Sequence, residues 1–117
     1  MQEYKNIKNL ITPLKEELVT KKIDVSLYSS LKQALPDSYL CIEEVFPKDE
    51  IEDIWSNFKP YLQEFQIFPI METLGEGVIC IGYDETNKGN IYYFDFDFGC
   101  FLLENSLESF ISALKDK

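Results

Sequence analysis

The stretch Val78-Ile-Cys-Ile-Gly-Tyr83, then Asp84-Glu-Thr-Asn-Lys-Gly89, then Asn90-Ile-Tyr-Tyr-Phe-Asp-Phe-Asp97, decides the fold of this chain. Two short runs rich in β-branched and aromatic residues flank a polar connection, which is the pattern of a β-hairpin. Asn87 or Gly89 can take the positive φ that a tight connection requires. The pattern therefore predicts antiparallel strands over residues 78–83 and 90–97.

Two further apolar runs, residues 65–70 and 100–103, lie on either side of this hairpin and extend it to an antiparallel meander. Side chains alternate between the two faces of a strand. Tyr92, Phe94, Phe96 and Phe98 should therefore share one face, and the other should carry Tyr93, Asp95 and Asp97. This alternation predicts one core face and one polar face.

The first half of the chain has helical periodicity. Apolar residues recur at steps of three and four at Tyr4, Ile7, Leu10, Ile11, Leu14 and Leu18. At Pro13, either Thr12 caps a second helix or the first helix kinks. Further helices are predicted over residues 26–35 with Ser26 as N-cap, over residues 37–45 opened by Pro36, and over residues 48–57 before a break or bend at Pro60.

The chain closes with a predicted helix in which Asn105 is the N-cap and Glu108 completes a capping box. Its apolar stripe consists of Leu107, Phe110, Ile111 and Leu114. Helices, then a meander, then a helix on the sheet define an α+β fold. We expect a single domain over residues 1–117, with an antiparallel or mixed sheet of about four to six strands.

The chain is strongly acidic, with 11 basic and 21 acidic residues and a net charge of −10. Such a surface repels phosphate backbones and anionic headgroups, so nucleic acid and membranes are poor partners. A basic protein is a better partner, because opposite fields speed encounter. The alternative is that the excess acid only keeps the protein soluble.

Catalytic and metal-binding signals are weak. The 117 residues include no histidine, the commonest general base and metal ligand. Cys41, Cys80 and Cys100 have no C-x-x-C spacing and are expected to be buried thiols in a reducing compartment. We expect no cofactor and no metal. The polar start and the short apolar stretches predict a cytoplasmic protein.

Two motifs could still carry chemistry. Residues 84–89 weakly resemble a calcium loop, but Lys88 stands where a ligand is required. Asp95 and Asp97 could act as an acid and a base, although such pairs normally come from different elements around a deep cleft. An exposed acidic face, solvated or in contact with a partner, is the preferred interpretation, and we expect a non-enzyme.

Four segments of the second half resemble the SUKH superfamily of bacterial toxin-immunity proteins and fungal regulators. They are Phe68-Pro-Ile70, Gly77-Val-Ile-Cys-Ile-Gly82, Gly89-Asn-Ile-Tyr-Tyr-Phe-Asp95 and Ser106-Leu-Glu-Ser-Phe110. Upstream, Leu35-Pro36 followed by Tyr39 is similar to an early segment of that superfamily. The Asn-Gly-Gly turn that often follows is replaced by residues 43–46.

The resemblance implies a mixed-sheet α+β fold and a non-enzymatic immunity protein that occludes a delivered toxin, often a nuclease or deaminase. Charge and strand alternation then predict the partner-binding residues Tyr93, Asp95 and Asp97, with Glu72, Glu76, Asp84 and Glu85 on adjoining loops. The alternatives are an intracellular regulatory or scaffold domain with no toxin partner, and a small hydrolase using Asp95 and Asp97. The oligomeric state is left open.

Overall fold

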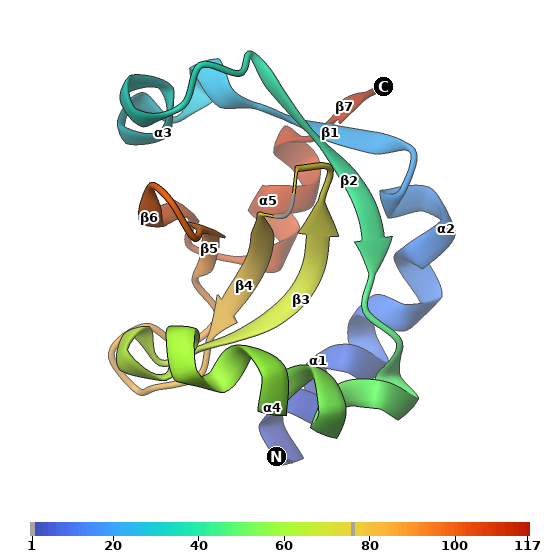
Figure 1. Cartoon of the computed structure of the whole chain (residues 1–117). Helices are drawn as coiled ribbons and strands as arrows, with labels where there is room; N and C mark the ends of the chain where they lie inside the picture. The colour runs from blue at the N-terminus through green and yellow to red at the C-terminus, as the bar shows by residue number, and fades with distance from the viewer. Residues whose placement is uncertain (1, 76) are drawn as a thin grey trace.

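The computed structural model of the chain describes residues 2–75 and 77–117. Within them, seven strands form one curled antiparallel sheet in the order β6-β5-β4-β3-β2-β1-β7 (Figure 1). The strands are β1 (Lys21–Asp24), β2 (Tyr39–Val45), β3 (Ile67–Thr73), β4 (Val78–Gly82), β5 (Ile91–Asp95), β6 (Gly99–Glu104) and β7 (Lys115–Asp116). The α-helices are α1 (Gln2–Ile11), α2 (Lys15–Leu18), α3 (Ser29–Ala34), α4 (Ile51–Leu62) and α5 (Leu107–Ala113). Short 3₁₀ turns are η1 (Thr12–Leu14), η2 (Val25–Leu27), η3 (Lys48–Glu50) and η4 (Gln63–Phe65).

The predicted meander is confirmed as β3 to β6, with small shifts at its ends. In the β4–β5 hairpin, Val78 pairs with Phe94 and Ile81 pairs with Ile91. β3 begins two residues later than predicted, because η4 precedes it and Gln66 turns the chain with a φ of 57°. The α+β class and the C-terminal helix are also confirmed.

The sheet has seven strands where about four to six were predicted, and the largest error lies at residues 37–45. This segment forms strand β2, not a helix opened by Pro36. The residue before a proline is pushed toward extended backbone, and Leu35 has φ −106° and ψ 142°. Pro36 therefore follows the end of α3, and β2 pairs with β1 and β3.

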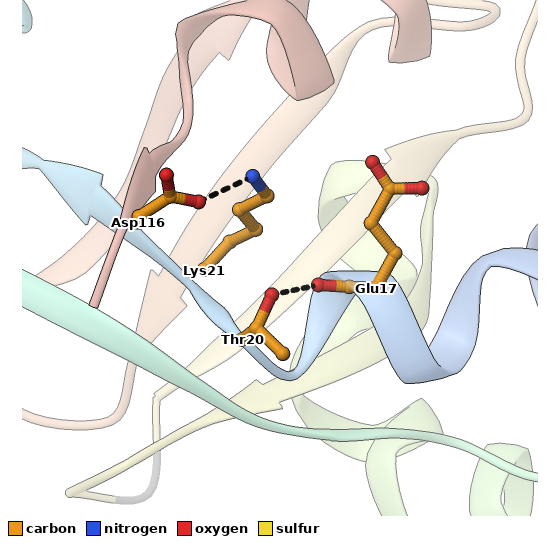
Figure 2. Close-up of polar contacts among 4 residues, drawn as sticks. All are labelled: Glu17, Thr20, Lys21 and Asp116. Carbon is orange, nitrogen blue, oxygen red and sulfur yellow. Dashed lines mark hydrogen bonds and ion pairs between the residues drawn. The ribbon is translucent and has the colours of Figure 1, made fainter.

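Strands β1 and β7 had no counterpart in the prediction, and they attach the C-terminus to the first half of the chain. Lys21 on β1 pairs with Asp116 on β7, and their side chains form a 2.6 Å ion pair (Figure 2). The backbone N–H of Lys117 donates to the carbonyl of Thr20 at 3.1 Å. The Lys117 ammonium group donates to the carbonyl of Ile42 at 2.8 Å.

Several helix details also differ from the prediction. Leu10, which was predicted to lie on the apolar stripe, is 69% exposed, and Lys8 is one of the buried residues of α1. The Thr12 hydroxyl donates to the Lys8 carbonyl at 2.6 Å, so Thr12 does not cap a new helix, and α1 passes through η1 into α2.

The predicted helix caps also need correction. Ser26 caps no helix; its N–H bonds to the Asp24 side chain in η2, and α3 starts at Ser29. Ser106, not Asn105, caps α5, because its side chain accepts from the Ser109 N–H. α4 continues beyond Pro60 to Leu62.

A hydrophobic core lies on each face of the sheet. Along β4, Val78 and Cys80 point into one core, and Ile79 and Ile81 point into the other. The larger core takes in residues of α1 and α5, and its ring-bearing members include Tyr4, Phe68, Tyr93 and Phe110. The smaller core is completed by α4 and contains Phe46, Leu62, Ile67, Val78, Cys80 and Phe94. Both faces of the central strands are therefore apolar.

Lys8 is a cation that is buried in the protein interior. Its side chain is 0% exposed, and its Nζ donates to the Ile70 carbonyl at 3.4 Å. Burial lowers the pKa of Lys8 from 10.5 to about 8, with a smaller opposing effect of Glu44. Because the unfolded chain keeps the higher pKa, it binds more protons between these two values, and stability should rise with pH across that window.

We expect Lys8→Met to raise the free energy of unfolding at pH 7 by about 1–3 kcal/mol, since an apolar side chain removes the desolvation cost. The gain should shrink above pH 8, where wild-type Lys8 loses its proton. Urea denaturation at pH 7 and at about pH 9.5 measures both effects. Lys5→Met on the exposed face of α1 is the control. A less stable Lys8→Met variant would show that the ammonium group stabilises the fold.

Candidate protein-binding site

The structure divides the predicted acidic residues between two ends of the sheet. Glu72 pairs with Val78, which pairs with Phe94, so Glu72 and the β5–β6 turn lie at one end. Asp84 and Glu85 follow β4 and lie at the other end, roughly 13 Å away along that strand. Glu76 lies outside the described residues. The predicted residues therefore do not form one patch.

Asp95 builds the β5–β6 turn. One oxygen of its carboxylate accepts the N–H groups of Asp97 at 2.8 Å and Phe98 at 3.1 Å. The other oxygen accepts the Tyr93 hydroxyl at 3.3 Å. Asp95 is half-buried and Asp97 is exposed. The Asp95 carboxylate therefore holds backbone in place, and exchanging it for lysine would disturb the turn itself.

Tyr93 does not lie on an exposed polar face, which corrects the alternation argument. Its side chain is 3% exposed and belongs to the larger core. Its hydroxyl packs against Gly77, where an added Cβ would lie 2.0 Å from the Tyr93 oxygen. Burial raises the pKa of Tyr93 to about 12. The ring is thus part of the fold, and a partner cannot cover it.

The loop over residues 84–90 is held by its own polar side chains. The Asp84 carboxylate accepts the Thr86 hydroxyl at 2.8 Å and the Thr86 N–H at 3.3 Å, which lowers the pKa of Asp84. The Asn87 amide donates to the carbonyls of Phe65 and Gln66. The loop is therefore tied to the start of β3.

An aromatic surface was missed by the sequence prediction. Phe96, in the β5–β6 turn, lies 5.0 Å from Tyr61 of α4 and 5.2 Å from Phe94, measured between ring centroids. Phe65 lies 6.0 Å from Phe94. We call the four half-exposed rings of this region the aromatic patch: Tyr61 is 50% exposed, Phe65 37%, Phe96 51% and Phe98 50%.

Two signals were available for the aromatic patch, and both were misread. Tyr61 lies three residues after Phe58 on α4, but the prediction stopped that helix before Pro60. Strand alternation assigned Phe96 and Phe98 to the core, but β5 ends at Asp95 and both rings leave the sheet in the turn.

Groups for chemistry are sparse in the described part of the chain. No set of three or more His, Cys, Asp or Glu side chains among those residues is placed to hold a metal ion. All three cysteines are free; Cys80 is buried, and Cys41 and Cys100 are half-buried. Burial raises the pKa of the Cys100 thiol to about 11, so it is a weak nucleophile near neutral pH. Residues 2–75 and 77–117 contain no helix long and apolar enough to cross a membrane.

An antiparallel α+β fold with exposed aromatic rings and carboxylates defines a candidate protein-binding protein. Residues 17–115 match the RhsPI family of Rhs-associated immunity proteins. No curated protein matches the chain. The chain belongs to the RhsPI family, so its class is that of immunity proteins, whose partners are protein toxins. Helix α1 precedes the matched residues.

Proposed function

We propose that this chain neutralises a basic Rhs toxin domain in the cytoplasm by binding it and covering its active site, without catalysing a reaction. The observation that carries the proposal is the match of residues 17–115 to the RhsPI family. The net charge of −10 supports the basic partner. A toxin domain that acts on nucleic acid, as a nuclease or deaminase does, needs a positive surface, and an acidic protein is suited to cover it.

We also propose a relationship to the SUKH superfamily. The four segments that resemble it fall on β3, β4, β5 and α5 in the second half of the chain, and β6 lies between the last two of these elements. Gly77 and Gly82, which bound the β4 segment, are both sites of close approach, where an added Cβ would lie 2.0 Å and 2.2 Å from its nearest atom. Two of the shared positions thus have a physical reason to stay glycine.

Calorimetric titration tests the proposal. The probe is an Rhs toxin domain from the organism that encodes this chain, inactivated at its catalytic residue. We expect a one-to-one complex whose affinity falls roughly tenfold between about 50 mM and about 300 mM salt, because ions screen the attraction. Absence of binding, or affinity unchanged by salt, would contradict a charge-steered immunity complex.

A pair of matched variants locates the charges that matter. Asp95→Asn with Asp97→Asn removes two charges at the β5–β6 turn, and an asparagine at 95 keeps an oxygen for the turn's N–H groups. Asp84→Asn with Glu85→Gln removes the same charge at the opposite end. We expect the first pair to slow association several-fold and the second to have less effect. If the two pairs slowed association equally, the attraction to the toxin would depend on the net charge of the chain and not on the charges of the β5–β6 turn.

A further inference from the structure

We infer that the aromatic patch is the docking site for the toxin, and that it receives an apolar spot rimmed by basic residues on that partner. The inference rests on the proposed function and adds the surface and the chemistry of contact. Tyr61, Phe96 and Phe98 are each half-exposed or more, and Phe65 adds a partly exposed edge. Phe96 meets Tyr61 directly, Phe65 is linked to Phe96 through the ring of Phe94, and Phe98 follows in the same turn. Exposed apolar side chains grouped in this way among polar residues are typical of protein-interaction sites.

The exposed rings are not needed to form the turn that carries them. Asp95 accepts the backbone N–H groups of Asp97 and Phe98, and Gly99 supplies the positive φ of 103°. These two residues meet the local demands of the β5–β6 turn. Phe96 and Phe98 could be polar without changing that backbone, yet both expose half of a phenyl ring to water.

The patch is also pre-organised. Phe96 is held from the side by Tyr61 at 5.0 Å with the rings nearly perpendicular, and from below by the buried ring of Phe94 at 5.2 Å. Phe58 of α4 lies 6.3 Å away. A ring fixed before binding loses little side-chain entropy on docking, which favours affinity.

The size of the patch suits the centre of an interface. An aromatic side chain exposes about 150–250 Å² when free, so four rings of these exposures leave on the order of 400 Å². A standard interface buries about 800 Å² on each partner, with a few aromatic anchors near its middle and a polar rim around them. The aromatic patch therefore has the size expected of the aromatic anchors at the centre of such an interface. The polar residues around the patch would form the rim.

Charge selects a basic partner over a second copy of this chain. Glu64 lies between Tyr61 and Phe65 in sequence, and Asp95 and Asp97 flank Phe96. Two copies meeting through this patch would bring these carboxylates together, which like-charge repulsion disfavours. A toxin surface with lysine or arginine around an apolar spot would pair with the same rim.

Single substitutions test the assignment against the same inactivated Rhs toxin domain. Phe96→Ala and Tyr61→Ala should each raise the dissociation constant about tenfold to hundredfold. The controls are Leu10→Ala and Leu27→Ala, which remove exposed leucines (69% and 52% exposed) from α1 and η2 and should leave affinity within about twofold. Thermal melting of each variant checks that the fold is kept.

The outcomes separate this inference from the proposed function. Tight wild-type binding that survives both Phe96→Ala and Tyr61→Ala would overturn the docking site and leave the immunity function standing. Absence of wild-type binding would overturn both. Light scattering gives an independent check: a wild-type dimer that Phe96→Ala dissociates would assign the patch to a second copy of the chain and contradict the inference.

Discussion

Gly82→Ala is expected to lower the free energy of unfolding by about 3 kcal/mol, because the end of β4 has no room for a methyl group. A Cβ at this position would lie 2.2 Å from the backbone oxygen of Asn87 and 2.7 Å from its Cγ. The loop over residues 84–90 cannot easily move away, because Gly82 donates a backbone hydrogen bond to Asn90 and accepts one from Gly89. The side chain of Asn87 is fixed in turn by the carbonyls of Phe65 and Gln66.

Gly89→Ala is the matched control for this prediction. Gly89 has a φ of +84°, but an added Cβ would meet no atom within 4 Å. Gly89→Ala should lower the free energy of unfolding by about 1 kcal/mol, which is the penalty of placing a side chain on left-handed backbone. Urea unfolding of the two variants ranks them. A Gly89→Ala variant that is less stable than Gly82→Ala would show that strain, not close approach, governs this hairpin.

Tyr4→Ala is expected to lower the free energy of unfolding by about 4 kcal/mol. The Tyr4 side chain is 0% exposed, its ring stacks on Phe68 with centroids 4.5 Å apart, and its hydroxyl donates to the Pro69 carbonyl. Trp55 of α4 meets the same ring edge-on at 6.4 Å. Truncation leaves a cavity where α1, α4 and β3 meet.

Tyr4→Phe separates packing from hydrogen bonding, because it keeps the ring and removes only the hydroxyl. We expect a smaller loss of about 1–2 kcal/mol, from the Pro69 carbonyl that is left without this donor. Thermal or urea unfolding gives both values. If Tyr4→Ala proved nearly neutral, α1, which precedes the family-matched residues, would be dispensable to the core.

Sequence patterns predicted the elements that depend mainly on residues close together in the chain. The alternation and turn residues around Val78 and Gly89 predicted the central hairpin, and the stripe through Phe110 predicted α5. β1 and β7 were missed because they are short and depend on pairing with distant segments, as Lys21 does with Asp116. β2 was taken for a helix because Pro36 was placed at a helix start, although it equally forces Leu35 into extended backbone.

The candidate site was harder to predict than the fold. Alternation along residues 92–98 assumed one continuous strand, and the strand stops at Asp95 because that side chain folds the next residues into a turn. Phe96 consequently lies outside, whereas Tyr93 lies inside because both faces of β5 pack against a hydrophobic core; both positions are the reverse of the prediction. The acidic residues stay predicted contacts, and strand register, which the sequence pattern does not give, places Asp84 and Asp95 at opposite ends.

Inhibition of toxin activity tests directly whether this chain neutralises its partner by occlusion. The active form of the same Rhs toxin domain would be titrated with the purified chain, and the rate of the toxin's reaction would be followed. We expect toxin activity to fall linearly to zero at one equivalent of the wild-type chain, and we expect Phe96→Ala to need a large excess to reach the same point. Full toxin activity in the presence of saturating chain would contradict neutralisation by occlusion.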